Sequence, residues 1–370
     1  MQSPVFEVQS GKVASRRTGT AVCATPFVSV IMPIRNEADF IAESLGAVLL
    51  QDYPADLMEV FVVDGMSTDA TREIVADLAA KYPRHSLKLL DNPGRIVATG
   101  LNVALRSAKG EVIVRSDGHC RIAPDYITRC VDHLSREQVD GVGGSINTIA
   151  ATAVGRAIAA VMSSPFGVGG SAFRTVKDRT MLVDTVPFPA YTRAAIEMAG
   201  PFDEDLVRNQ DDEYNYRLRK LGARILLASD VKSDYYSRTS LRSLWRQYFQ
   251  YGFYKVRVMQ KHVRQMQPRQ FVPAAFVIAL LAGALLAPFN ATVRGLWLAV
   301  VVTYAAATVA ASIVTVGKSG SSNVGLVAVA FPILHISYGL GFLTGLAHFA
   351  RRPSRAAVQP GLKRDQENSR

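Results

Sequence analysis

The sequence contains little cysteine. Its three cysteines, Cys23, Cys120 and Cys130, are widely spaced and form no Cys-x-x-Cys pair. This pattern argues against a disulfide framework and against a structural zinc site, so we expect the chain to fold in a reducing compartment. A Gly-x-Gly-x-x-Gly fingerprint is also missing after the first strand-like run. Its absence excludes a dinucleotide-dependent oxidoreductase.

Acidic residues are scarce in the last third of the chain. After Asp234 the only acids are Asp365 and Glu367, against sixteen Lys and Arg, so the net charge of +11 belongs to this third. The same region holds the longest apolar runs. This combination fits an anionic bilayer surface better than nucleic acid. No nucleic-acid recognition motif accompanies the charge, so we expect no nucleic-acid partner.

Strand-like apolar runs alternate with helical patterns in the first half of the chain. We expect strands at Val28–Met32, Met58–Val63, Leu87–Leu90, Glu111–Arg115 and Gly141–Gly144, and helices at Glu37–Leu50, Thr68–Lys81, Arg95–Ala108 and Pro124–Leu134. This alternation predicts an α/β fold with a mostly parallel sheet covered on both faces. Residues 155–170 are rich in Gly, Ala and Ser, and we expect an irregular, substrate-facing loop there.

Residues 240–264 combine aromatic and basic side chains at helical spacing, as in Trp245, Tyr248 and Phe249 beside Arg242 and Arg246. An amphipathic basic helix of this kind can lie in the headgroup region of a membrane. The alternative is a core-packing helix with a solvated basic face. The interfacial interpretation is favoured because three apolar segments follow directly.

The three apolar segments are Phe271–Phe289, Leu296–Val316 and Val324–Phe349. The second and third are long enough to cross a bilayer, whereas the first is short. Three spans would put the arginines at 351, 352 and 355 on the side opposite the α/β domain, against the positive-inside tendency. We therefore expect a re-entrant or interfacial first segment and two true spans.

Three acidic clusters lie in the first two thirds of the chain: Asp64, then Asp117 with His119, then Asp211-Asp212-Glu213. Each follows a strand-like run, and ligands of open α/β sheets bind beyond the carboxyl ends of strands. One cluster could hold a base and sugar, one a metal and one a proton. The sequence therefore predicts a metal-assisted transferase that uses a sugar nucleotide.

Several segments resemble a known family in their sequence and order. They are VSVIMPIRNEADFI, VVDGMSTDAT, NPGRIVATGLNVALRSAKGE, VRSDGHC, VGG and NQDDEYNYRLRKLG. Residues 27–235 are thus similar to the GT-A fold, family-two glycosyltransferases. DGHC, DTVPFPAYTR and WRQYFQYGFYK look most like the succinoglycan-type (ExoA-like) membrane-bound exopolysaccharide glucosyltransferases.

The residue patterns and the resemblance together predict a division of the chain into five parts. They are a flexible leader (1–25), a GT-A nucleotide-sugar-binding domain (26–236), an amphipathic interfacial helix region (237–268), membrane segments with two or three spans (269–350) and a basic tail (351–370). An export signal at Arg16-Arg17 is disfavoured, because the residues that follow run into a strand pattern rather than a signal core.

The resemblance also implies a set of donor-binding residues. They are Pro33, Glu37, Asp64, Arg95, Asp117 and Arg246. A carboxylate such as Glu37 or Asp64 can accept hydrogen bonds from a base imide or a ribose hydroxyl. Their alternatives are a helix N-terminal acid for Glu37 and a turn or cap residue for Asp64. Arg95 and Arg246 have the alternative of solvated or snorkelling side chains.

Asp117 and His119 match the family's Asp-x-Asp metal motif, with His replacing the second Asp. The implied cofactor is a divalent metal, Mn²⁺ or Mg²⁺, and imidazole favours Mn²⁺. The alternative for His119 is a hydrogen-bonding loop residue. Asp211 matches the final Asp of the family's Glu-Asp pair, which acts as general base. Gln210 replaces the Glu, and Asp212 is the close alternative as base.

The implied activity is inverting, nonprocessive transfer of a hexose, as from UDP-glucose, to a polyprenyl-diphosphate-linked oligosaccharide in exopolysaccharide biosynthesis. The processive motif Gln-x-x-Arg-Trp is missing, since its nearest match is Gln247 to Tyr251, and no membrane helix precedes the domain. The implied location is the bacterial inner membrane, with the catalytic domain in the cytoplasm and polysaccharide assembly proteins as possible partners. Polyprenyl phosphate as acceptor, or a catalytically silent assembly scaffold, are the alternatives.

Overall fold

The computed structural model describes residues 25–319 and 323–351; the predicted leader and basic tail therefore lie almost entirely outside the described residues. Within these ranges, nine strands form one sheet in the order β3-β2-β1-β4-β8-β6-β9-β5, with β7 paired to β9. The strands are β1 (Val28–Ile34), β2 (Met58–Asp64), β3 (Ser86–Asp91), β4 (Val112–Arg115), β5 (Cys120–Ile122), β6 (Gly141–Ile149), β7 (Met181–Leu182), β8 (Ala190–Thr192) and β9 (Ile225–Tyr236).

The sheet is parallel in its first half and mixed in its second. Strands β3, β2, β1 and β4 run parallel, as the alternation of strand and helix predicts. Strand β8 is antiparallel to β4 and β6, whereas β6 and β9 are parallel, and β5 and β7 are antiparallel to β9. The predicted α/β class is confirmed, and the second half adds antiparallel strands that no sequence pattern indicated.

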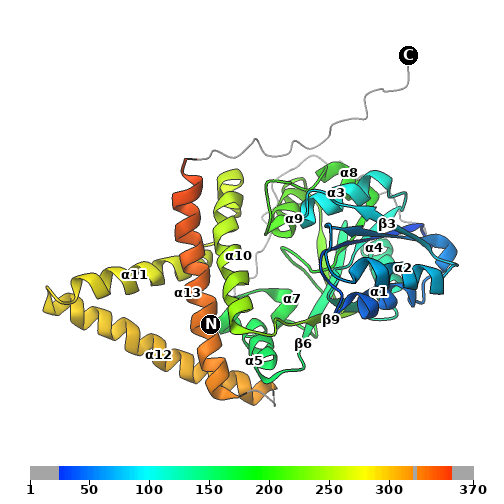
Figure 1. The fold of residues 1–370 in the computed structure, drawn as a ribbon. Coiled ribbons are helices and arrows are strands. Elements are labelled where there is room, and N and C mark those ends of the chain that lie inside the picture. Colours follow the sequence, from blue (N-terminus) through cyan, green and yellow to red (C-terminus); the bar gives the residue numbers. More distant parts are fainter. Residues whose placement is uncertain (1–24, 320–322, 352–370) are drawn as a thin grey trace.

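Helices cover both faces of the sheet (Figure 1). One face carries α1 (Ile41–Leu49), α2 (Thr71–Lys81) and α4 (Tyr126–Arg136), and the other carries α3 (Val97–Ser107), α8 (Arg193–Ala199) and α9 (Gln210–Lys220). Side chains of a strand alternate between the two faces. In β2, Val60 and Val62 accordingly join one core and Phe61 and Val63 the other. Burial on both sides explains why these strands are apolar at almost every position.

The segment expected to be an irregular loop at residues 155–170 is largely helical, and that expectation is wrong. It forms α5 (Ala153–Met162) and α6 (Pro165–Val168), and α7 (Ala172–Thr175) follows. Thr152 caps α5 by accepting a hydrogen bond from the Gly155 amide. The small residues that suggested a loop serve close packing instead, because α5 lies between β6 and the C-terminal helices.

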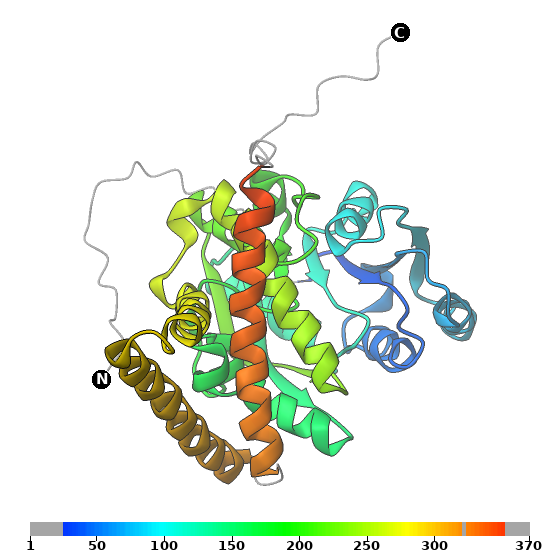
Figure 2. The same cartoon turned by 60° about the vertical axis from the view of Figure 1, so that its left-hand side comes forward.

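Four long helices form the C-terminal part. They are α10 (Leu241–Lys261), α11 (Val272–Leu286), α12 (Ala291–Ser319) and α13 (Val324–Phe349), and short 3-10 turns lie at Ala55–Leu57, Val263–Gln265 and Pro268–Gln270. Helix α10 begins at a capping box formed by Ser240 and Ser243. It runs beside α13, while α11 and α12 project as a V away from the sheet (Figures 1 and 2).

Among the described residues, two helices are long and apolar enough to cross a membrane: residues 291–318 of α12 and all of α13. Helix α11 has 15 residues, about 22 Å of length at 1.5 Å per residue, which is shorter than the hydrocarbon core. The structure therefore confirms that the first apolar segment is shorter than the other two. Helices α11 and α12 also leave large apolar side chains exposed, including Leu285, Leu296 and Val302, as does Phe289 in the turn between them.

Helix α10 packs against α13 through glycines. A Cβ on Gly252 would overlap the carbonyl oxygen of Tyr338, and one on Gly341 would overlap the carbonyl oxygen of Phe249. The two backbones thus approach more closely than any larger residue allows. The buried face of α10 includes Leu244, Tyr248 and Val256.

Two lysines of α10 do not lie where the interfacial interpretation put them. Lys255 is paired with Asp212, and Lys261 is paired with Asp203 and Asp205. Their side chains are only 7% and 1% exposed, so they face the α/β domain rather than lipid headgroups. The pairs form because acidic loops of the α/β domain lie directly against this helix.

The glycine contact predicts opposite effects for two alanine substitutions. Gly252→Ala should destabilise the protein by about 1–3 kcal/mol, because the added methyl overpacks the α10–α13 contact. Gly295→Ala is the matched control, since nothing lies within 4 Å of a Cβ at that position of α12. It should leave stability unchanged or raise it by about 0.5–1 kcal/mol through helix propensity. Thermal unfolding in one detergent measures both, and equal midpoints would contradict the packing.

Candidate active site

A cleft of about 980 Å³ opens at the carboxyl ends of β1 and β4, with α10 forming one wall. Its position agrees with the rule that open α/β sheets bind ligands beyond the strand ends. The cleft brings together most of the residues that the sequence singled out. They are Pro33, Glu37, Arg95, Asp117, His119, Asp211, Asp212 and Arg246.

Arg115 is the central residue that the sequence reasoning missed. Its Nε donates to Asp117 Oδ1 at 2.9 Å, and its Nη1 pairs with Asp211. The guanidinium is 8% exposed, and its planar fork suits simultaneous pairing with two carboxylates. Arg115 therefore joins the second and third acidic clusters, which are far apart in sequence. A charged residue at the end of the apolar run Val112–Val114 was the available signal.

The electrostatics of this triad follow from its burial. Desolvation lowers the pKa of Arg115, but the charges of Asp117 and Asp211 raise it more, so Arg115 remains a fixed cation. Desolvation raises the pKa of Asp211 above its ordinary value of 3.8, Arg115 lowers it, and Asp117 raises it again; the net direction is upward. The Asp211 side chain is 42% exposed, but this surface faces the cleft, where surrounding protein limits hydration.

Glu37 and His119 contact each other directly. His119 Nδ1 lies 2.8 Å from Glu37 Oε1, and the edge of the His119 ring meets Tyr235 with ring centroids 5.2 Å apart. A carboxylate on Nδ1 fixes the imidazole tautomer that leaves Nε2 as the metal-binding nitrogen, which is the usual outer-shell arrangement for a ligating histidine. This donor set of carboxylate and oriented imidazole fits a divalent cation, although the described residues contain no cluster of three potential ligands.

Asp64 does not line the cleft, and its predicted direct contact with the donor stays a prediction. Its side chain is 0% exposed. The carboxylate accepts hydrogen bonds from the Ser67 amide and hydroxyl and pairs with Arg72 Nη1 at 2.8 Å. Asp64 thus orders the turn after β2, which is the alternative role considered for it. Arg72 also pairs with Asp91, which links β2 to β3.

Pro33 and Arg95 both line the cleft but differ in burial. Pro33 is buried near the end of β1, whereas Arg95 is exposed in the turn before α3. The Arg95 backbone has φ of 60°, a left-handed conformation that is uncommon for a residue with a side chain. Its amide donates to the Asn92 carbonyl at 3.0 Å. The turn holds Arg95 at the cleft outside the helix, whose first residue is Val97.

The third acidic cluster begins a helix instead of following a strand. Asn209 adopts a left-handed conformation before α9, and its side chain donates to the Tyr251 carbonyl at 3.0 Å. Arg208 donates to Gln250 Oε1, also at 3.0 Å. The turn that presents Asp211 is therefore attached to α10 through Arg208 and Asn209, and Asp211 itself is attached to the sheet through Arg115.

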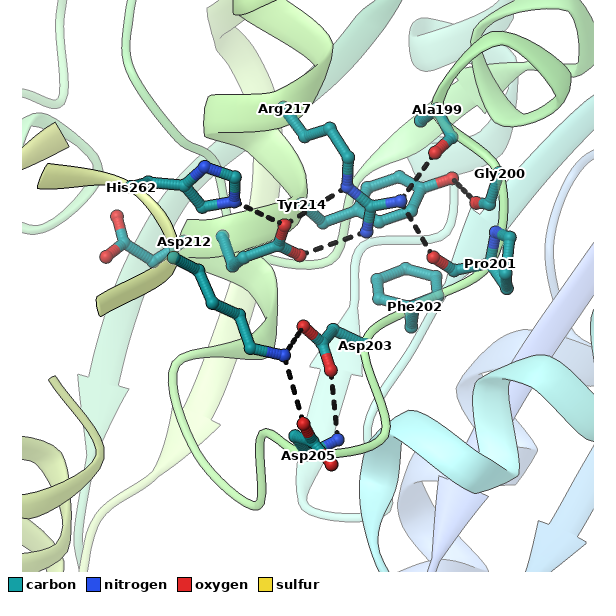
Figure 3. A network of polar contacts seen from close by, with 12 residues as sticks. Ala199, Gly200, Pro201, Phe202, Asp203, Asp205, Asp212, Tyr214, Arg217 and His262 are labelled. Carbon is teal, nitrogen blue, oxygen red and sulfur yellow. Dashed lines mark hydrogen bonds and ion pairs between the residues drawn. The ribbon is translucent and has the colours of Figure 1, made fainter. Parts of the chain in front are cut away.

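A buried polar network extends this attachment (Figure 3). Glu213 pairs with Arg217 at 3.0 Å and lies 3.0 Å from His262 Nε2. Burial raises the pKa of Glu213, but the contacts with His262 and Arg217 lower it more. Lys261 holds Asp203 in the loop before α9. A network that satisfies its buried charges in this way fixes a single arrangement of the loop.

The contacts also distinguish Asp211 from Asp212. Asp212 pairs with Lys255 of α10, whereas Asp211 shares Arg115 with Asp117. Only Asp211 is thus connected to the candidate metal residues, although both carboxylates line the cleft.

The fold is a GT-A fold. The mannosyltransferase PcManGT from Pyrobaculum calidifontis, solved in complex with GDP-Man and Mn²⁺, has a similar fold, with a TM-score of 0.56 and 24% identity over 89% of this chain and 88% of that one. The family profile for Glycosyl transferase family 2 matches residues 29–183. Together with the relative from Rhizobium meliloti described next, this match shows that the chain belongs to glycosyl transferase family 2.

Relatives extend the match beyond that profile. Succinoglycan biosynthesis protein ExoA of Rhizobium meliloti (strain 1021) is 32% identical over 331 residues, covering 87% of this chain and 96% of the relative. A dolichyl N-acetyl-alpha-D-glucosaminyl phosphate 3-beta-D-2,3-diacetamido-2,3-dideoxy-beta-D-glucuronosyltransferase of Methanococcus voltae is 29% identical over 241 residues, covering 64% of this chain and 74% of the relative. The first match includes the C-terminal helices, because it spans nearly the whole chain.

The Arg115 bridge predicts a stability loss that depends on pH. Arg115→Met leaves Asp117 and Asp211 unpaired. Breaking a fully buried ion pair lowers the free energy of unfolding by about 3–5 kcal/mol. The loss here should be smaller, because Asp211 is partly exposed. Loss of the cation raises the pKa of Asp211 further above its unfolded value. The loss of stability caused by the Asp211 charge is therefore absent below the pKa of Asp211 in the unfolded chain. It grows as pH rises through the pKa of Asp211 in the folded protein.

Unfolding midpoints of wild type and Arg115→Met should consequently differ more at pH 7.5 than at pH 5. Adding Asp211→Asn to Arg115→Met should restore part of the loss at pH 7.5, since it removes one of the two unpaired charges. A gap that is constant across this pH range would show that Arg115 stabilises the cleft by packing alone.

Proposed function

We propose that the protein is an inverting, metal-dependent, nonprocessive glycosyltransferase that moves a hexose from a nucleotide sugar to a lipid-linked oligosaccharide. UDP-glucose is the proposed donor and a polyprenyl-diphosphate-linked oligosaccharide the proposed acceptor. The observation that carries this proposal is the Arg115 bridge, because it joins the candidate metal residue Asp117 and the candidate base Asp211 in one cleft.

Asp211 is the proposed general base. Its carboxylate takes the proton from the attacking acceptor hydroxyl, and the raised pKa makes it a better proton acceptor than an ordinary Asp. Arg115 holds this carboxylate in place from one side. A single base and a single displacement opposite the leaving group invert the anomeric carbon, so an α-linked donor gives a β-linked product.

Asp117 and His119 are the residues that would hold the divalent cation. The cation, when bound, neutralises charge on the departing nucleotide diphosphate as a Lewis acid. Glu37 orients His119 through Nδ1. Pro33, at the end of β1, and Arg95, in the turn before α3, are proposed to contact the base, ribose or phosphates of the donor. Asp64 is left out of the donor contacts because it is fully buried.

A membrane role is supported by the exposed apolar side chains of α11 and α12 and by two helices long enough to span. The name of the Rhizobium meliloti relative supports a role in exopolysaccharide synthesis. The name of the Methanococcus voltae relative describes a transfer to a sugar on dolichyl phosphate, which supports a lipid-linked sugar as acceptor. We propose attachment to the bacterial inner membrane with the catalytic domain in the cytoplasm, near proteins of polysaccharide assembly.

The base assignment predicts that Asp211→Asn lowers kcat by about 10²–10⁴ while the KM for the donor changes little. Asn keeps the size of the side chain and can still contact Arg115. The matched control is Asp212→Asn, which breaks the Lys255 pair and should lose much less activity. Incorporation of radiolabelled sugar into membrane-extracted lipid measures both, with UDP-glucose and other nucleotide sugars as donors.

In wild type, kcat/KM should fall toward acidic pH with a midpoint above 3.8, because the raised pKa of Asp211 shifts protonation of the base upward. An inactive Asp212→Asn beside an active Asp211→Asn would transfer the base role to Asp212. Label from another nucleotide sugar, but not from UDP-glucose, would keep the mechanism and replace the donor.

The metal assignment predicts that Asp117→Asn abolishes Mn²⁺ binding in the presence of UDP, as measured by electron paramagnetic resonance. Glu37→Gln should weaken Mn²⁺ binding by about 10–100-fold, since it alters only the residue that orients His119. Glu43→Gln is the control, because Glu43 pairs with Arg121 and does not line the cleft. Unchanged Mn²⁺ affinity in Asp117→Asn would overturn the assignment.

A further inference from the structure

The cleft has a large excess of arginine. Eight arginines and four carboxylates line it, a net formal charge of +4. A nucleotide diphosphate and the divalent cation that accompanies it largely cancel each other's charge. The proposed donor therefore leaves most of the excess positive charge unbalanced, which favours binding of a second anionic ligand.

Three of these arginines lie together along α10. Within α10, Arg242 and Arg246 are four residues apart, and so are Arg246 and Gln250. The side chains of Arg242, Arg246 and Gln250 therefore follow one face of the helix. Gln250 Oε1 accepts a hydrogen bond from Arg208 Nε at 3.0 Å, which brings Arg208 to the end of this line. We call Arg208, Arg242 and Arg246 the arginine row. Among the described residues, no carboxylate pairs with any member of the row, whereas Arg115 is neutralised by Asp117 and Asp211.

Two buried glutamines beside the row offer acceptor atoms to the cleft. Gln247 and Gln210 are only 7% and 6% exposed, and both line the cleft. The Oε1 atom of each has no hydrogen-bond partner in the part of the chain that the structure describes. A buried carbonyl oxygen without a donor is costly, and a sugar hydroxyl is a suitable donor. Gln210 directly precedes Asp211, so such a hydroxyl would lie near the proposed base.

The row also lies beside apolar surface. Trp245 stands between Arg242 and Arg246 in sequence and is 39% exposed. The buried face of α10 packs along α13, from which the apolar helices α11 and α12 extend (Figure 2). Helix α13 lies between α10 and these two helices, and Trp245 is the exposed apolar side chain next to the row.

We propose that the arginine row binds the phosphate groups of the lipid-linked acceptor, and that Gln247 and Gln210 receive hydroxyls of its sugar. This inference rests on the proposed function and assigns Arg246 to the acceptor in place of the donor. Charge-assisted hydrogen bonds from arginine to phosphate are strong and directional, so the row both retains the lipid and orients its sugar. The acceptor hydroxyl is then presented to Asp211 from the α10 side of the cleft.

Farnesyl diphosphate is the probe for the row, because it combines a diphosphate with a short isoprenoid chain. It should bind the purified full-length protein in detergent with UDP and Mn²⁺ already present. Farnesol and inorganic diphosphate should bind more weakly, since each lacks one half of the ligand. Arg242→Ala and Arg246→Ala should each weaken farnesyl diphosphate binding by about tenfold or more, and the double variant should leave UDP affinity unchanged.

Three controls make the outcome specific. Arg136→Ala removes an exposed arginine outside the cleft and should change neither affinity. Arg246→Lys should recover part of the binding, because it restores the charge without the planar fork. Gln247→Leu should leave farnesyl diphosphate binding intact and raise the KM for the sugar-bearing lipid extract.

Competition between UDP and farnesyl diphosphate, or loss of UDP affinity in the double variant, would overturn the proposal and return the row to the donor. Equal binding of inorganic diphosphate would reduce the site to a general anion site and would also overturn it. Failure of the proposed function has a different signature: no UDP, GDP or ADP binding by the wild type, whatever its affinity for farnesyl diphosphate.

Discussion

Helix α10 is held by charged contacts on one side and by backbone contact on the other, and the arrangement of the site depends on this. Lys255 and Lys261 pair with Asp212 and Asp203 in the segment that carries the candidate base. On the opposite side, Gly252 lets the helix approach α13. The ion pairs are largely removed from water, so breaking one partner is costly. The turn that presents Asp211 is consequently positioned by the same helix that joins the apolar helices.

This shared helix gives a physical reason for a catalytic site beside apolar surface. The cleft has the sheet on one side, which supplies Asp117, His119 and Arg115, and α10 on the other, which supplies Arg242 and Arg246. A nucleotide sugar and an amphipathic acceptor have different polarity and need different walls. The proposed division assigns the strand ends to the donor and metal, and the helix to the acceptor. Arg115 links the strand ends to the start of α9, because it pairs with both Asp117 and Asp211.

Much of the first half of the fold was predictable, because strands buried on both faces leave continuous apolar runs. The second half was not. Strand β8 has three residues and β7 two, too short for a periodic pattern to identify. The Gly, Ala and Ser content of residues 155–170 suggests a loop, whereas the segment forms α5 and α6, whose small residues pack closely against partners distant in sequence. Glu37, Asp117, His119 and Asp211 were found from their motifs, whereas Arg115 and Arg208 were not, because their roles depend on long-range contacts.

The sequence by itself determined the family, the α/β order of the first half, the apolar character of the C-terminal helices and the residue types available for catalysis. Tertiary structure alone decided which acids share a cleft. Asp64 and Asp117 both end strand-like runs, yet packing buried the first with Ser67 and Arg72 and left the second facing the cleft. Sequence motifs report residue types and spacing, whereas burial and pairing depend on which distant segments meet. The same reason explains why Asp211 and Asp212, adjacent in sequence, pair with Arg115 and Lys255 respectively.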